Sequence, residues 1–166
     1  MISIKNNFPI YSFILIFIFI NFESIGSNIS EINNNNITIE IQIHDKIFNG
    51  VLFKNPSTEK LLEKFPITLE MSDLHKNEKY FHLSENLPTN SQHVENIRTG
   101  DLMLFGANNF VLFYKDFDTS YNYTRLGYIT DVTGLESALG KDSVKVKFYL
   151  KEKRLIQNIL VKMPMN

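Results

Sequence analysis

Aromatic side chains are the residues of this sequence whose type and spacing most suggest a binding site. Five rings fall at positions 80–81, 114 and 121–123, and four of them are tyrosines. Large rings with polar tips suit a groove that binds a peptide or a small apolar ligand. The alternative, and the commoner role, is that such rings pack the interior of a fold. The ligand-binding candidates are Tyr80, Phe81, Tyr114, Tyr121 and Tyr123.

We expect Tyr121 and Tyr123 to be the exposed pair, because they lie in a polar stretch with Asn122 between them. They should border the main cleft, with Tyr114 beneath them. Two arginines add a possible charge to this site, since Arg98 and Arg125 each end a polar stretch just before a predicted strand. An arginine in such a position either contacts a ligand in a groove or is solvated and paired at the surface, which is the commoner case.

The sequence lacks the patterns that cofactor chemistry requires. It has no cysteine, which removes disulfides, thiolate nucleophiles and cysteine-based zinc sites. No two histidines share His-x-x-x-His spacing around a glutamate, and the calcium-loop-like segment 116–127 lacks the required glycine and glutamate. A net charge of −1 with scattered lysines argues against a nucleic-acid partner. We therefore predict no metal, no cofactor and no nucleic acid.

Residues 1–26 have the features of a secretory signal peptide. Lys5 is followed by an apolar run at 10–20 and then by small residues up to Ser27. The run covers about half of the ~20 residues that a membrane-spanning helix needs. We expect cleavage after Gly26 or Ser27, a secreted or periplasmic protein, and no stable membrane span in the mature form. The alternative is an uncleaved segment that tethers the protein to a membrane.

The remaining sequence predicts a mainly β fold. Asn55 and Pro56 can begin a short amphipathic helix that Pro66 ends, and 134–140 indicates a second helical turn. Alternation of apolar and polar residues predicts strands at 37–43, 47–53, 67–71, 79–83, 101–105, 110–115, 126–130 and 144–150. The stretches 84–96 and 116–124 are predicted loops. About eight strands with short connections favour a closed barrel, which leaves no exposed edge.

Several strings, in this order, resemble the bacterial branch of the cyclophilin-like family. The strings are FPITLEMSDLHKNEKYFHL, ENLPTN, IRTGDLMLFG, FVLFYKDFDTSYNYTRLGYI and GLESALG. The resemblance implies an eight-stranded barrel closed by two short helices, as in the true cyclophilins, which are peptidyl-prolyl isomerases. The predicted organisation is a signal peptide at 1–26, an Asn-rich linker at 27–36, a cyclophilin-like domain at 37–150 and a C-terminal extension at 151–166.

The resemblance also shows which residues of a proline isomerase are missing. True cyclophilins carry a Phe-His-Arg string whose arginine favours the twisted amide, and here the string is Phe81-His82-Leu83. We expect Leu83 to face the cleft or the core. The favoured function is an exported binding module without established catalysis. One alternative is a weak or altered isomerase in which Arg98 or Arg125 replaces the donor, and another is a structural domain whose partner is a protein.

Overall fold

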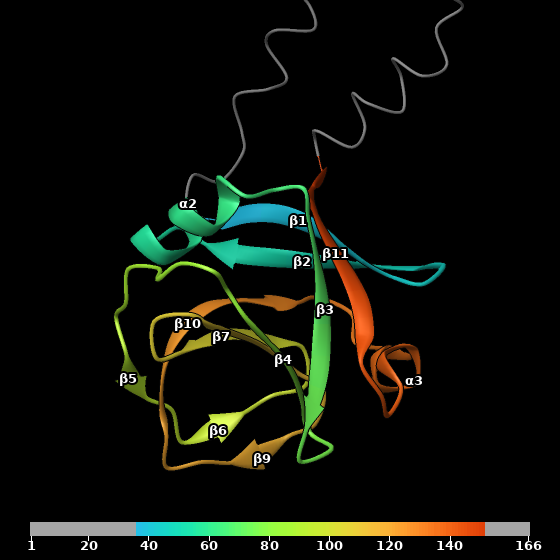
Figure 1. The fold of residues 1–166 in the computed structure, drawn as a ribbon. Helices are drawn as coiled ribbons and strands as arrows, with labels where there is room; N and C mark the ends of the chain where they lie inside the picture. Colours follow the sequence, from blue (N-terminus) through green and yellow to red (C-terminus); the bar gives the residue numbers. More distant parts are fainter. Residues whose placement is uncertain (1–35, 152–166) are drawn as a thin grey trace, which may run out of the picture. The chain divides into compact units, whose positions relative to one another are not determined.

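A computed structural model describes residues 36–151 of the chain, so the predicted signal peptide, nearly all of the linker and residues 152–166 lie outside the described residues. Within this range eight long strands carry the fold (Figure 1). They are β1 (Asn36–Ile43), β2 (Lys46–Phe53), β3 (Ile67–Leu74), β4 (Glu78–His82), β7 (Asp101–Phe105), β8 (Asn109–Phe113), β10 (Asn122–Ile129) and β11 (Val144–Leu150). Each coincides with a predicted strand, although β3 and β10 are longer than the sequence pattern indicated.

The long strands form one closed antiparallel barrel. Hydrogen-bonded neighbours follow the order β2-β1-β11-β3-β4-β8-β7-β10, and β10 then pairs with β2 to complete the ring. Gly127 of β10 lies at this seam, since it is opposite Leu102 of β7 on one side and Leu52 of β2 on the other. The predicted closed barrel of about eight strands is therefore confirmed.

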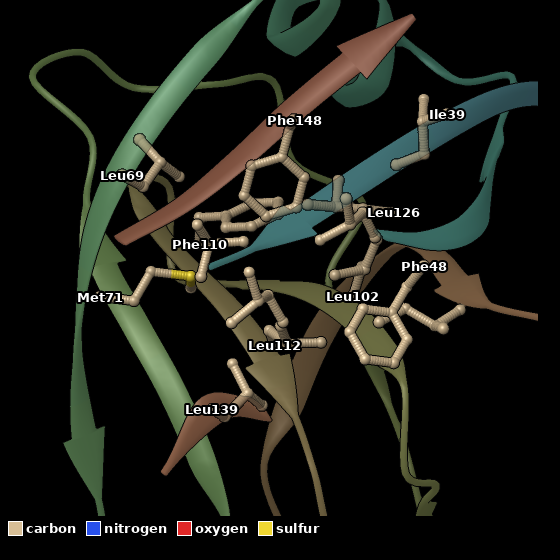
Figure 2. Close-up of a cluster of buried hydrophobic side chains, with 14 of the residues drawn as sticks. Ile39, Phe48, Leu69, Met71, Leu102, Phe110, Leu112, Leu126, Leu139 and Phe148 are labelled. Carbon is tan, nitrogen blue, oxygen red and sulfur yellow. The ribbon is translucent and has the colours of Figure 1, made fainter. Parts of the chain in front are cut away.

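The barrel interior is a continuous apolar core. Alternation in β1 turns Ile39, Ile41 and Ile43 fully inward. Figure 2 shows aliphatic side chains from β3, β7 and β10 gathered around the rings of Phe110 and Phe148. These two rings meet edge to face with their centroids 5.2 Å apart, a preferred geometry for aromatic pairs.

Two short helices close the barrel at opposite ends of the β3–β11 pair. The helix α2 (Pro56–Leu62) is capped as predicted, because Asn55 Oδ1 accepts a hydrogen bond from the Thr58 N–H at 2.9 Å. The helix α3 (Leu135–Leu139) buries its apolar residues in the core just before β11. The predicted helices at both places are confirmed.

Three two-residue strands lie in the stretches that were predicted to be loops. They are β5 (Gln92–His93), β6 (Asn96–Ile97) and β9 (Phe117–Asp118). β6 pairs with β9, and β5 extends the start of β10. The prediction of one continuous loop over 116–124 is therefore wrong. The two stretches pair with each other, and this pairing of distant segments could not be read from local sequence.

Candidate functional site

The candidate site is a cleft of about 580 Å³ on the outer face of the barrel. Successive side chains of a strand point to opposite faces, so the two faces of β4 have different roles. Lys79 is fully buried on the inner face, and Phe81 packs against the barrel core on the same side. Glu78, Tyr80 and His82 point outward and line the cleft.

A second apolar cluster forms the base of this cleft. It contains Val94, Ile97, Met103, Val111, Phe113 and Tyr123, with Tyr80 and Phe117 packed against it. Met103, Val111 and Phe113 lie on strands β7 and β8, whose alternate residues belong to the barrel core. The paired strands β6 and β9 add Ile97 and Phe117 to this cluster, so these two short strands form one wall of the site.

A row of neighbouring rings runs along the cleft. Tyr121 meets Phe105 edge to face at 5.8 Å between centroids, and Phe105 is 5.5 Å from Tyr123. Tyr123 is then 5.6 Å from Phe113, which is 5.6 Å from Phe117. Each pair lies at a distance where edge and face contacts between rings are favourable. The row starts at the solvent and ends in the buried cluster.

Three of the five aromatic candidates line the cleft, namely Tyr80, Tyr121 and Tyr123. The expected exposed pair is only half right, because Tyr121 is 61% exposed whereas Tyr123 is 5% exposed. β10 begins at Asn122, so Tyr123 is a strand residue whose ring turns onto the apolar cluster. Tyr121 precedes the strand and stays in solvent.

The other two aromatic candidates do not line the cleft. Phe81 packs on the opposite face of β4, against the barrel core. Tyr114 is 5% exposed, and its hydroxyl donates a 2.6 Å hydrogen bond to Asp73 Oδ2. Burial, and then the Asp73 carboxylate, raises the pKa of the Tyr114 phenol well above its usual range. The expectation that Tyr114 lies beneath the cleft is therefore wrong, because its ring packs in the barrel core.

Neither arginine candidate reaches the cleft. Arg98 is 72% exposed in its side chain, and its guanidinium lies 3.7 Å from the Asp116 carboxylate. Arg125 lines a second cavity of about 290 Å³, between the start of α2 and the chain around residue 90. Of the described residues that line the main cleft, none is a lysine or an arginine.

Acidic groups instead set the charge of the cleft. Burial, and then repulsion by the Asp73 carboxylate, raises the pKa of Glu78 to about 7. Burial, and then the nearby charge of Glu78, also raises the pKa of Tyr123 to about 12. Asp118 of β9 is a second carboxylate in the lining. Sequence reasoning missed Glu78, His82 and Asp118, although the period of two in β4 places Glu78 and His82 on the same face as Tyr80.

Within residues 36–151, no cluster of three or more histidine, aspartate or glutamate side chains is arranged to hold a metal ion. What the cleft offers is concave shape, aromatic surface and carboxylate charge. These features suit non-covalent recognition of a small molecule or a side chain.

The sequence profile described as the cyclophilin-like family matches residues 41–149. The chain belongs to the cyclophilin-like family. No curated protein matches the chain. The solution structure of a hypothetical protein from Archaeoglobus fulgidus is similar, with a TM-score of 0.52, 15% sequence identity, and coverage of 72% of this chain and 98% of that one. At this identity the likeness shows the shared fold alone.

Leu83 was expected to face the cleft or the core, and the structure places it in the core. Its side chain is 4% exposed and belongs to the barrel core, which is one of the two places expected from the sequence. Its backbone N–H donates a 2.8 Å hydrogen bond to the Asn108 carbonyl, which fixes the chain just after β4. Leu83 is thus an apolar core residue of the barrel.

Proposed function

We propose that this cyclophilin-like protein is an exported binding module whose cleft takes a peptide side chain or a small ligand. The observation that carries the proposal is that one end of the aromatic row is exposed to solvent in the cleft. Phe105 is 42% exposed and Tyr121 is 61% exposed, and both line the cleft. Large exposed rings beside a concave surface are characteristic of recognition sites. The other end of the row packs into the second apolar cluster, where Phe113 is fully buried and Phe117 is partly buried.

Binding to the cleft is testable with a simple aromatic probe. The full chain, uniformly labelled with ¹⁵N, should be titrated with benzyl alcohol while amide shifts are recorded. We expect concentration-dependent shifts confined to residues of β4, β8, β9 and the start of β10. Tyr121→Ala should reduce the affinity severalfold without a change in thermal stability, because the side chain is exposed. Shifts that are spread over the whole barrel, or absent, would contradict the proposed site.

The isomerase alternative predicts a different result. A positioned hydrogen-bond donor in an electrostatic site contributes roughly 10²–10³-fold in rate, and no described lysine or arginine lines the cleft. We expect the full chain to accelerate isomerisation of an Ala-Pro tetrapeptide far less than a true cyclophilin at equal concentration. A comparable rate would support the alternative, and Arg98→Ala and Arg125→Ala would then identify the donor.

Export is the part of the proposal that rests on residues 1–26 of the sequence. Among the described residues, no helix combines the length and apolarity needed to cross a membrane. Mass spectrometry of the protein recovered from medium or periplasm should give a chain that starts near residue 27. An intact amino terminus in the membrane fraction would instead support a tethered protein.

A further inference from the structure

Among the described residues that line the cleft there are carboxylates but no lysine or arginine. Glu78 from β4 and Asp118 from β9 are its carboxylates. Ion pairs elsewhere in the described barrel use other acidic residues, and neither of these two has a cation within 4 Å. The side-chain amide of Asn96 donates a hydrogen bond to Asp118 Oδ1, so the hydrogen-bond partner of Asp118 is a neutral group. The cleft therefore holds acidic groups that no cation of the described residues balances.

Two amide oxygens add to this imbalance. The Oδ1 atoms of Asn77 and Asn109 are buried, and no donor of the described residues reaches them. Both residues line the cleft, Asn77 directly before Glu78 and Asn109 opposite His82 in the β4–β8 pairing. A carbonyl oxygen without a donor keeps its partial negative charge unscreened by a hydrogen bond. The lining therefore holds two acceptor oxygens without donors in addition to the two carboxylates.

The aromatic row is a third feature of the cleft that attracts positive charge. The face of a tyrosine or phenylalanine ring carries negative quadrupole density and attracts cations within about 6 Å of its centroid. Tyr80, Tyr121 and Tyr123 line the cleft together with Phe105 and Phe117. Rings and carboxylates around one concave space are the combination that proteins use to bind organic ammonium groups.

We infer that the cleft binds an organic cation, namely a protonated amine carried on an apolar or aromatic body. The inference rests on the proposed binding function and specifies its ligand class. Glu78 is the counter-charge, and the rings contact the apolar body. The cleft volume of about 580 Å³ fits a ligand of this kind.

Proton binding at Glu78 gives the inference a pH signature. Because the pKa of this carboxyl is raised to about 7, a large share of it is protonated at neutral pH. The other titratable groups that line the cleft are His75 from the β3–β4 turn, His82 and Tyr80 from β4, Asp118 from β9, and Tyr121 and Tyr123 around the start of β10. Asp73 from β3 and Tyr114, which follows β8, also interact with the Glu78 carboxyl. A cation favours the ionised carboxylate, so its affinity should rise as pH increases through about 7.

The test compares three probes of similar size, one positive, one neutral and one negative, on the ¹⁵N-labelled full chain. Benzylamine is a cation at pH 8, benzyl alcohol is neutral and benzoate is an anion. We expect benzylamine to bind about tenfold more tightly than benzyl alcohol, as one favourable charge contact gives, and benzoate to bind most weakly. Glu78→Gln should reduce benzylamine to the affinity of benzyl alcohol. Glu70→Gln, which removes an exposed carboxylate outside the cleft, should leave it unchanged.

The pH arm and a peptide arm complete the experiment. Between pH 6 and pH 8 the affinity for benzylamine should increase in the wild type, and Glu78→Gln should remove most of that increase, whereas a contribution from any other group would persist in the variant. Comparing Nα-acetyl-lysine amide with benzylamine distinguishes a basic peptide from a free amine as the source of the cation. Equal affinity for all three benzyl probes would overturn the inference and leave the binding function standing. No cleft shift with any probe would refute the binding function itself.

Discussion

Replacing Asp73 by asparagine should lower the free energy of unfolding by about 3–5 kcal/mol at neutral pH, the usual cost of leaving a buried charge without its partner. The charge in question is Lys79, whose side chain is fully buried inside the barrel. Its ammonium donates a 2.8 Å hydrogen bond to Asp73 Oδ2 and a 2.7 Å bond to the Asp142 carbonyl. The ring of Tyr114 lies 5.6 Å from the same nitrogen. Chemical denaturation of wild type and variant measures the difference.

Two comparison variants make this result specific. Glu70→Gln breaks an exposed pair with Lys145, in which the charged atoms are 4.0 Å apart, and should cost less than about 1 kcal/mol. The triple variant Asp73→Leu, Lys79→Met, Tyr114→Phe removes the buried polar group with its partners and should recover much of the stability, because an apolar replacement avoids the desolvation of the charges. A loss below about 1 kcal/mol in Asp73→Asn would show that Lys79 finds another partner.

The effect of Asp73→Asn also has a defined pH dependence. Burial alone would raise the pKa of Asp73, but hydrogen bonds from Lys79 and Tyr114 outweigh burial, so the net pKa is lowered from its ordinary value. A lowered pKa in the folded state means that the carboxylate stabilises the fold above its unfolded pKa of about 3.9 and loses this contribution as pH falls through the folded pKa. The difference between wild type and Asp73→Asn should therefore shrink below about pH 4.

The barrel was predictable from sequence because its strands alternate cleanly. Ile39, Ile41 and Ile43 repeat with a period of two, and the structure buries all three. The cap at Asn55 was equally local, since its side chain accepts a hydrogen bond from the N–H of Thr58, three residues further along the chain. Lys79 could not be predicted as buried, because a lysine in a strand is normally exposed. Its burial depends on Asp73 in the neighbouring strand and on Tyr114 and Asp142 elsewhere in the chain.

The cleft was only partly predictable for the same reason. Tyr80 and Tyr121 could be chosen by residue type, and both line the cleft. Phe81 and Tyr114 are also aromatic, but Phe81 follows Tyr80 in β4 and therefore lies on the opposite face, and Tyr114 packs in the barrel core. Asp118 could not be assigned to the cleft without the pairing of β9 with β6, whereas Glu78 lies on the same face of β4 as Tyr80. Which side chains line the cleft therefore depends on pairings between segments about 20 to 40 residues apart in the sequence, and composition does not reveal these pairings.

Gly127 has the strongest steric constraint at the barrel seam. The register of β10 against β7 shifts between Arg125 and Gly127, so β10 bends there and turns toward β2. A Cβ atom at this position would lie 2.0 Å from the Val51 carbonyl oxygen and 2.9 Å from Leu52 Cα. Both contacts are with backbone, so no side-chain rotation can relieve them.

Gly127→Ala should therefore lower the free energy of unfolding by about 3 kcal/mol or more, at the upper end of the cost of overpacking, because β2 and β10 must separate to make room. Gly106→Asn is the matched control. That glycine has a φ of 61° in the β7–β8 turn, and a Cβ atom there would meet nothing within 4 Å. Asparagine tolerates such a turn conformation, so the change should be small. Amide hydrogen exchange gives the local readout, since the first amides to lose protection in Gly127→Ala should be those of Asn49 and Val51, the β2 residues whose backbone groups face β10. A Gly127→Ala protein as stable as wild type, with these amides still protected, would mean that the barrel does not close through a direct β2–β10 contact.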